Sequence, residues 1–179
     1  MTADQPPSGP GVSVRAAGPC EVALLAELNR LSFAAPGAGA FAGTPWSARS
    51  LAEVMALPGV FGMLALAGEA PAGFLLAQVL FEDAEILSLG VLPEHRRAGH
   101  GRRLLQAAMA EAARRGARRL RLEVAENNRG ALGLYTGLGF APAGRRRNYY
   151  RMADGTVVDA VICDCKLAPP GGAVAEDAS

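Results

Sequence analysis

The segment Leu89–Arg103, LGVLPEHRRAGHGRR, constrains the fold and chemistry of this chain more than any other part. An apolar run that predicts a strand, Ile86–Val91, is followed by a basic, glycine-bearing loop at Arg96–Gly101. Apolar residues then recur at the spacing of a helix, at Leu104, Leu105, Ala108, Met109 and Ala112. In such a unit, backbone N–H groups, the helix N-terminus and arginine side chains can all face one anion. The segment therefore predicts a phosphate-binding loop.

Two common phosphate motifs do not fit this loop. No Gly-Lys-Ser/Thr closes it, which excludes a Walker loop, and its glycine spacing differs from the dinucleotide fingerprint. The pattern Arg-x-x-Gly-x-Gly, formed by Arg96, Gly99 and Gly101, resembles the acyl-CoA pyrophosphate loop of the GNAT N-acetyltransferase superfamily. On these residues alone, a basic strand-to-helix turn without a ligand is the alternative.

The second half of the chain extends the resemblance. The stretch LEVAENNRGALGLYTGLGF, residues 122–140, is similar to the second half of GNAT proteins. The stretch RRRNYYRMADGTVVDAVICDCKL, residues 145–167, and Thr44-Pro45-Trp46-Ser47 resemble one branch, the bacterial ribosomal-protein-alanine N-acetyltransferases. That resemblance spans roughly residues 13–167. It implies acetyl transfer from acetyl-CoA to the N-terminal amine of a protein, with a ribosomal protein as first guess.

Residue patterning predicts the elements around the loop. Strands are expected at 12–17, 59–67, 73–81, 85–91 and 120–124, and helices at 19–31, 46–55, after the loop, and near 131–135. A last hairpin is expected to turn at Ala153-Asp154-Gly155. This order predicts an α/β (mixed α+β) fold of the GNAT type, with about seven strands in a mixed sheet and about four helices on its two faces. We expect one domain at 13–167, flexible ends at 1–12 and 168–179, and a mobile loop at 33–44.

Composition limits the function. The 179 residues are half apolar, enough for one core, and a net charge of +1 argues against a general nucleic-acid binder. No apolar run is long enough for a membrane span, and the first twelve residues lack signal-peptide features, so we expect a cytoplasmic protein. Cys163 and Cys165 share a strand face, but no second pair or histidine completes a metal site. Buried thiols are expected there, and no metal.

Acetyl transfer to an amine needs a base for the amine, a donor for the oxyanion and an acid for the departing thiolate. Through the resemblance, Glu123 is the expected base and Tyr135 the expected acid. The alternatives are a solvated strand carboxylate for Glu123 and a core aromatic for Tyr135. We expect Glu123 to be partly buried.

The expected cofactor contacts come from three segments. Backbone groups of Leu89, Gly90 and Val91 would face the thioester and oxyanion, and Gly90 suits a bulge that splays the sheet. Asn128 would hold either the pantetheine arm or its own turn. His95 and His100 are expected to be loop residues rather than metal ligands. The pyrophosphate would be held by Arg96, Arg97, Ala98, Gly99, His100, Gly101 and Arg102.

The sequence indicates the residues that contact the acceptor less specifically than those that contact the cofactor. Tyr149 and Tyr150 are expected to contact an acceptor peptide, whereas Arg145–Arg147 can be read as a solvated charged turn. Glu126 adds a negative charge near the expected base, and His100 stands where the family usually has an aliphatic residue. Two alternatives stay open: acetylation of a small amine such as a polyamine, amino acid or antibiotic, and a non-enzymatic acyl-CoA-binding module. The sequence does not indicate an oligomeric state.

Overall fold

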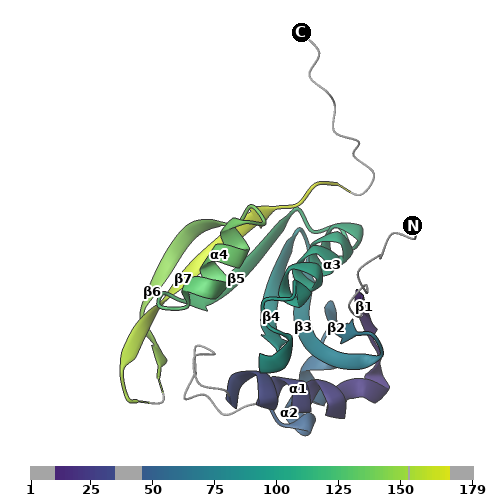
Figure 1. Ribbon diagram of the computed structural model, residues 1–179. Helices are drawn as coiled ribbons and strands as arrows, with labels where there is room; N and C mark the ends of the chain where they lie inside the picture. The colour runs from purple at the N-terminus through teal and green to yellow at the C-terminus, as the bar shows by residue number, and fades with distance from the viewer. Residues whose placement is uncertain (1–10, 35–45, 153, 170–179) are drawn as a thin grey trace, which may run out of the picture.

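A computed structural model describes residues 11–34, 46–152 and 154–169, and Figure 1 shows their arrangement around one sheet. The strands lie in the order β1-β2-β3-β4-β5-β7-β6. Only β4 and β5 pair in parallel, so the sheet is mixed, as predicted. In chain order the elements are β1 (Val12–Ala17), η1 (Pro19–Glu21), α1 (Val22–Ala34), α2 (Ala48–Met55), β2 (Val60–Ala67), β3 (Ala70–Leu80), β4 (Asp83–Val91), η2 (Pro93–His95), α3 (His100–Arg114), β5 (Arg119–Ala125), α4 (Arg129–Thr136), β6 (Ala141–Arg151) and β7 (Val157–Lys166).

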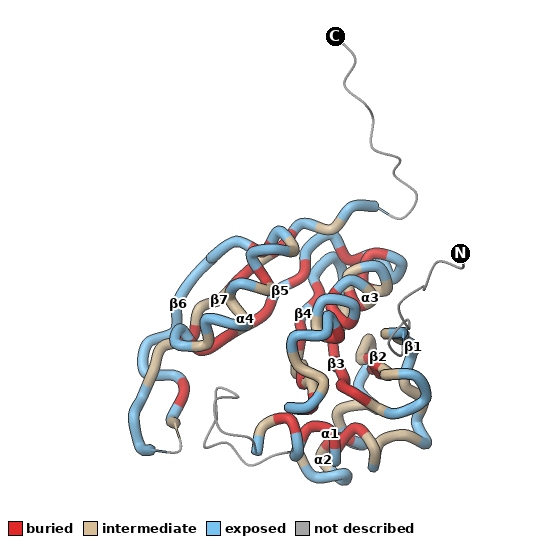
Figure 2. The backbone as a smooth tube through the Cα atoms, in the orientation of Figure 1, coloured by how far each residue is buried: buried red, intermediate tan, exposed pale blue. Residues whose placement is uncertain are grey.

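Helices cover both faces of the sheet, which confirms the predicted layers. On one face, Leu25 of α1 and Leu51 of α2 pack against Phe74 of β3. On the other, Leu104 of α3 packs in one cluster with Leu120 of β5 and with residues of α4. Figure 2 shows that buried residues follow the central strands, whereas β6 is exposed along most of its length. None of the described helices is long and apolar enough to cross a membrane.

The sheet opens between β4 and β5. These strands pair only where Asp83–Glu85 lie beside Arg119–Arg121. β4 continues to Val91 paired with β3, while β5 continues to Ala125 paired with β7. Beyond Glu85, the edge of β4 that faces β5 therefore has no strand partner within the described part of the chain. The backbone N–H and C=O groups on this edge are therefore available to hydrogen-bond a partner other than a strand.

The bulge expected at Gly90 lies elsewhere. Opposite β3, the register shifts between Ser88 and Ile86, which makes Leu87 the extra residue. Gly90 pairs in register with Phe74. A Cβ atom at Gly90 would lie 2.5 Å from Phe74 Cε1 and 2.8 Å from Ser32 Oγ. The glycine is needed for the close approach of α1 and β3, and the bulge prediction was wrong.

Some helix boundaries in the structure differ by a few residues from the predicted ones. α1 continues through Phe33 and Ala34, which were expected in a loop. α3 already begins at His100, because Gly99 adopts φ +89° and turns the chain into the helix. The predicted end of that helix is confirmed, since Gly116 has φ +97° after Arg114. The remainder of the expected loop and almost all of both expected flexible ends lie outside the described residues.

Candidate active site

The loop before α3 presents backbone donors at a helix N-terminus. Arg97 and Gly99 both have positive φ, at 65° and 89°. The first bond into the helix runs from Arg103 N to Gly99 O at 3.1 Å, so the amides of residues 100–102 come before it. A Cβ atom at Gly99 would meet nothing within 4 Å. Open space above unpaired amides and a positive helix end fits a pyrophosphate group.

The arginines of the loop divide into two kinds. Arg96 donates to Val91 O at 3.2 Å and to Ser32 O at 2.8 Å, so it ties the loop to β4 and α1. Arg102 donates to Gly137 O at 3.1 Å and ties α3 to the end of α4. Arg97 and Arg103 are exposed, and the side chain of neither makes a hydrogen bond or ion pair in the described part of the chain. Arg103, just beyond the motif, was not singled out from the sequence.

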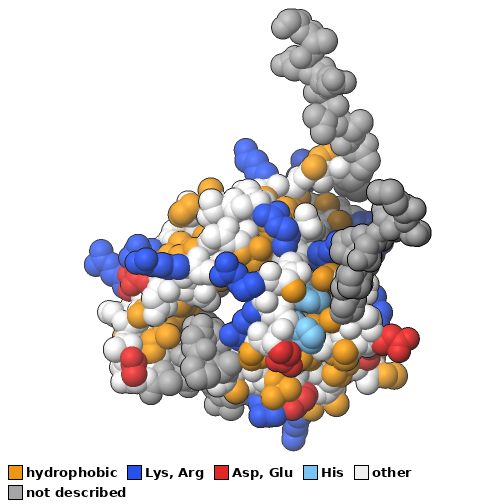
Figure 3. Space-filling view, viewed as in Figure 1, with side chains coloured by type: hydrophobic (Ala, Val, Ile, Leu, Met, Phe, Trp, Pro, Cys, Tyr) orange, Lys and Arg blue, Asp and Glu red, His pale blue; other side chains and the backbone are white. Residues whose placement is uncertain are grey.

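On the face of the molecule that Figure 3 shows, Lys and Arg side chains lie near the histidine atoms at the surface. His100 itself is buried at 3% exposure, with its ring 5.5 Å from the ring of His95. Burial lowers the pKa of His100, and His95 and Arg103 lower it further. Its side chain is therefore buried beneath the surface of the loop. Ala98 is an exposed residue of the same turn.

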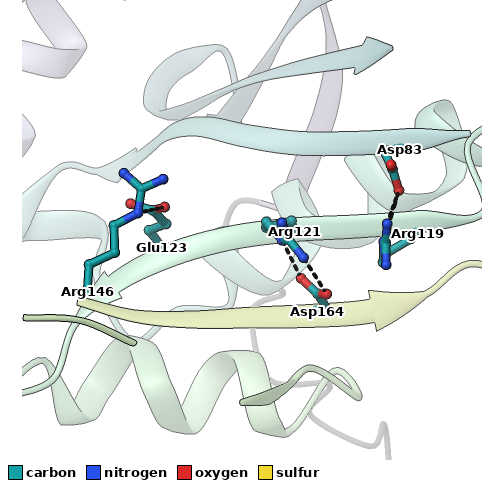
Figure 4. A network of polar contacts seen from close by, with 6 residues as sticks. All are labelled: Asp83, Arg119, Arg121, Glu123, Arg146 and Asp164. Atoms are coloured by element: carbon teal, nitrogen blue, oxygen red, sulfur yellow. Dashed lines mark hydrogen bonds and ion pairs between the residues drawn. The ribbon is translucent and has the colours of Figure 1, made fainter. Parts of the chain in front are cut away.

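Glu123 lies on the face of β5 opposite the α3 core. Leu122 and Val124 point into that core, whereas the Glu123 side chain is 14% exposed on the other face, so it is partly buried as expected. Its Oε1 lies 3.0 Å from Arg146 Nε of β6, as Figure 4 shows. Glu126 adds little negative charge here, because Arg145 Nη1 pairs with it at 2.8 Å. The Glu123 carboxylate thus faces a cation.

Tyr135 and Tyr150 bring a phenol to each side of β5. Tyr135 of α4 is 8% exposed and its ring lies 5.9 Å from Phe140. Burial raises the pKa of Tyr135 to about 12, with a smaller contribution from Cys163. Burial also raises the pKa of Tyr150, and Glu123 and then Tyr149 and Tyr135 add to that rise. Tyr150 is therefore within electrostatic reach of both the expected base and the expected acid, which make no hydrogen bond with each other in the described part of the chain.

Tyr149 and Tyr150, both expected to contact the acceptor peptide, lie at a bulge in β6. Arg146 pairs with Ala160 and Tyr150 with Val158, so three residues of β6 stand opposite Asp159. Asn148, at φ 52°, donates its amide to Asp159 Oδ1 at 2.9 Å. Tyr149 is 48% exposed, whereas Tyr150 is buried. Of these two tyrosines, only Tyr149 has an exposed ring.

The structure also locates the other residues that the sequence singled out. Leu89, Gly90 and Val91 lie on the part of β4 that faces the open edge. Asn128 caps α4, because its Oδ1 accepts from Ala131 N at 3.1 Å, which supports the reading in which it holds its own turn. Cys163 and Cys165 are buried, and burial raises the pKa of both thiols.

Two buried polar residues of α1, Asn29 and Ser32, were not predicted from the sequence. Asn29 Nδ2 donates to Ser88 Oγ of β4 at 3.3 Å, and its Oδ1 accepts from Trp46 N at 3.2 Å. Ser32 is 2% exposed, and its Oγ has no partner among the described residues. Both residues share the helical spacing of the apolar face of α1, which was the available signal.

Comparisons with known proteins found a family profile and several relatives that match the chain. A profile of the "Acetyltransferase (GNAT) family" matches residues 28–140. The "[Ribosomal protein bS18]-alanine N-acetyltransferase" of Escherichia coli K12 is 42% identical over 91 residues, which are 51% of this chain and 61% of that relative, less than two thirds of its length.

Solved structures cover more of the chain. The ribosomal-protein-S18-alanine N-acetyltransferase from Escherichia coli has a TM-score of 0.75 at 25% identity, over 94% of this chain and 99% of that one. A Salmonella typhimurium protein solved with its cofactor acetyl-CoA has a TM-score of 0.72 at 20% identity, over 94% and 99% of the two chains. That second likeness concerns the fold alone.

Proposed function

Because the chain belongs to the acetyltransferase (GNAT) family, we propose that it transfers an acetyl group from acetyl-CoA to the N-terminal α-amine of a protein. The proposed acceptor is a ribosomal protein that begins with alanine, as the names of its relatives suggest. Such an acceptor would place the reaction in the cytoplasm.

The observation that carries the proposal is the opening between β4 and β5. The strands separate after Glu85, and the unpaired amides of α3 lie at the end of the loop that follows β4. Glu123 lies on β5, and Tyr135 lies on α4, the helix that follows β5. The N-terminal amides of α3, with Arg97 and Arg103, would hold the pyrophosphate. Acetyl-CoA, when bound, supplies the acetyl thioester. The backbone of Leu89–Val91 would donate to the thioester carbonyl from the open edge.

The two side chains divide the proton transfers. Glu123 would accept a proton from the acceptor amine, directly or through one water, because a peptide amine with a pKa near 8 needs only a weak base. Tyr135 would donate its hydroxyl proton to the departing sulfur. A buried phenol with a pKa of about 12 stays protonated at neutral pH, so it begins each cycle in the form that donates.

The test is to incubate the purified protein with acetyl-CoA and a peptide library that varies the first residue, alongside free polyamines and amino acids. Mass spectrometry should find the acetyl group on the α-amine of alanine-leading peptides. Faster acetylation of a free amine than of any peptide would overturn the protein acceptor. Binding of acetyl-CoA without transfer to any amine would overturn catalysis and favour the acyl-CoA-binding module.

A further inference from the structure

The run Arg145–Arg147 has no part in the proposed function, yet its members lie in different surroundings. Arg145 Nη1 pairs with Glu126 at 2.8 Å and with Asp159 at 3.2 Å. Arg146 instead turns towards Glu123. The run is therefore not a uniform solvated turn.

Arg146 makes two contacts at once. Its Nε lies 3.0 Å from Oε1 of Glu123, and its Cζ lies 5.1 Å from the centroid of the Tyr149 ring. The Tyr149 ring in turn stands edge-on to the Tyr150 ring, with centroids 4.9 Å apart. A guanidinium over an aromatic face is attracted by the ring, which restricts its rotamers. The exposed tyrosine thus steadies the cation that faces the expected base.

We propose that Arg146 is a positioning residue for Glu123 and orients the carboxylate on its face of β5 through their ion pair. This inference rests on the proposed role of Glu123 as the base. A general base has to lie within hydrogen-bond reach of the proton that it accepts, so the orientation of the carboxylate limits the rate of proton transfer. Because the Glu123 side chain is 14% exposed and that of Arg146 52% exposed, solvent screens the pair only in part.

The other groups around Glu123 do not replace this cation. From β6, the buried Tyr150 phenol is neutral at physiological pH and carries no positive charge. On β7, the residue paired with Glu123 is Ile162. Arg121, on the same strand face, is bound through two nitrogens to Asp164 of β7 at 2.8 and 2.9 Å, and it also feels Asp83 and Glu85 of β4. Figure 4 shows these pairs as separate units along β5.

The experiment compares Arg146→Met, which removes the charge, with Arg146→Lys, which keeps it. Arg119→Met is the matched control, because Arg119 lies on the same strand as Glu123, pairs with Asp83 of β4 at 2.8 Å and is 49% exposed. For each protein, kcat and KM for an alanine-leading peptide are measured separately, and acetyl-CoA affinity by calorimetry.

We expect Arg146→Met to lower kcat about tenfold while the peptide KM stays near that of the wild type, because the carboxylate loses its fixed orientation. Arg146→Lys should keep most of the wild-type kcat, because it keeps the charge that pairs with Glu123. Arg119→Met should match the wild type. Acetyl-CoA affinity should be unchanged in all three.

An unchanged kcat in Arg146→Met, or an equal loss of kcat in Arg119→Met, would overturn the positioning role. Should Arg146→Met fail to fold, Arg146→Gln removes the same charge and decides the point. A wild-type protein that acetylates no peptide would instead refute the proposed function, so the two failures are distinguishable.

Discussion

Replacing Gly90 by alanine tests the contact that brings α1 against the sheet. The added Cβ would lie 2.5 Å from Phe74 Cε1, 2.7 Å from Ser32 Cβ and 2.8 Å from Ser32 Oγ. Carbon atoms in contact normally stay about 3.5–4.0 Å apart, so each contact is too short by about 1 Å. Phe74 is 0% exposed and Ser32 2% exposed, so neither side chain can swing into solvent. The backbone of α1 or β4 has to shift.

Overpacking of this kind costs typically about 1–3 kcal/mol, and two buried neighbours place Gly90→Ala at about 2–3 kcal/mol of lost unfolding free energy. In a chain of this size that corresponds to a fall in Tm of roughly 4–12 °C. A shift of α1 would also strain the bond from Arg96 Nη2 to Ser32 O, now 2.8 Å, which holds the loop before α3. Weaker acetyl-CoA binding should therefore accompany the loss of stability.

The assay is urea unfolding followed by circular dichroism, together with calorimetry for acetyl-CoA. Gly133→Ala is the matched control, because a Cβ at Gly133 of α4 meets nothing within 4 Å. Alanine is the better helix former, so that variant should be stabilised by up to about 1 kcal/mol. Equal unfolding free energies for wild type and Gly90→Ala would refute the packing argument.

Four further predictions concern the site. Gly99→Val should raise the acetyl-CoA Kd more than about tenfold, because Gly99 has φ +89° and any side chain there enters the open space above the α3 amides; unchanged affinity by calorimetry contradicts this. Glu123→Gln should keep acetyl-CoA binding and lower kcat about 10²-fold at neutral pH, with a smaller loss at high pH; near-wild-type rates would leave Glu123 as a strand residue. Tyr135→Phe should lower kcat without changing the peptide KM. The burial that raises the pKa of Tyr135 to about 12 also predicts that its contribution to stability, complete below about pH 10, is lost as pH rises towards 12, so urea unfolding of Tyr135→Phe should be less alkali-sensitive than that of the wild type. Asn128→Ala should cost about 1 kcal/mol through loss of the α4 cap, with Asn128→Asp nearly neutral; an unchanged unfolding curve for Asn128→Ala would exclude the cap as a source of stability.

Local features of the site followed from the sequence because they depend on residues close together along the chain. The turn into α3 needs a residue that tolerates positive φ, and Gly99 supplies it. Alternation in β5 separates Leu122 and Val124 from Glu123, and a period of two is enough to assign them to opposite faces. Ser47 is another local feature: it directly precedes α2 and caps it, because Ser50 N donates to Ser47 Oγ at 3.1 Å.

Contacts between distant segments could not be predicted in this way. Arg96 looked like a phosphate ligand, but it bonds to the carbonyl of Ser32, 64 residues earlier. Tyr149 and Tyr150 were both expected to contact the acceptor, but adjacent strand residues take opposite faces, and the bulge opposite Asp159 decides which of the two is exposed. A bulge changes which face a side chain takes, and neither its position nor its presence is encoded in a simple repeat.

The sequence by itself determined the order of elements, the glycine-bearing turn before α3 and the face of β5 on which Glu123 lies. The tertiary structure alone decided where β4 and β5 separate, why residue 90 must be glycine and which of three consecutive arginines faces Glu123. The physical reason is that helix and strand periods and turn preferences act over a few residues. Register and close packing depend instead on which segments meet, and this is set by the whole core at once.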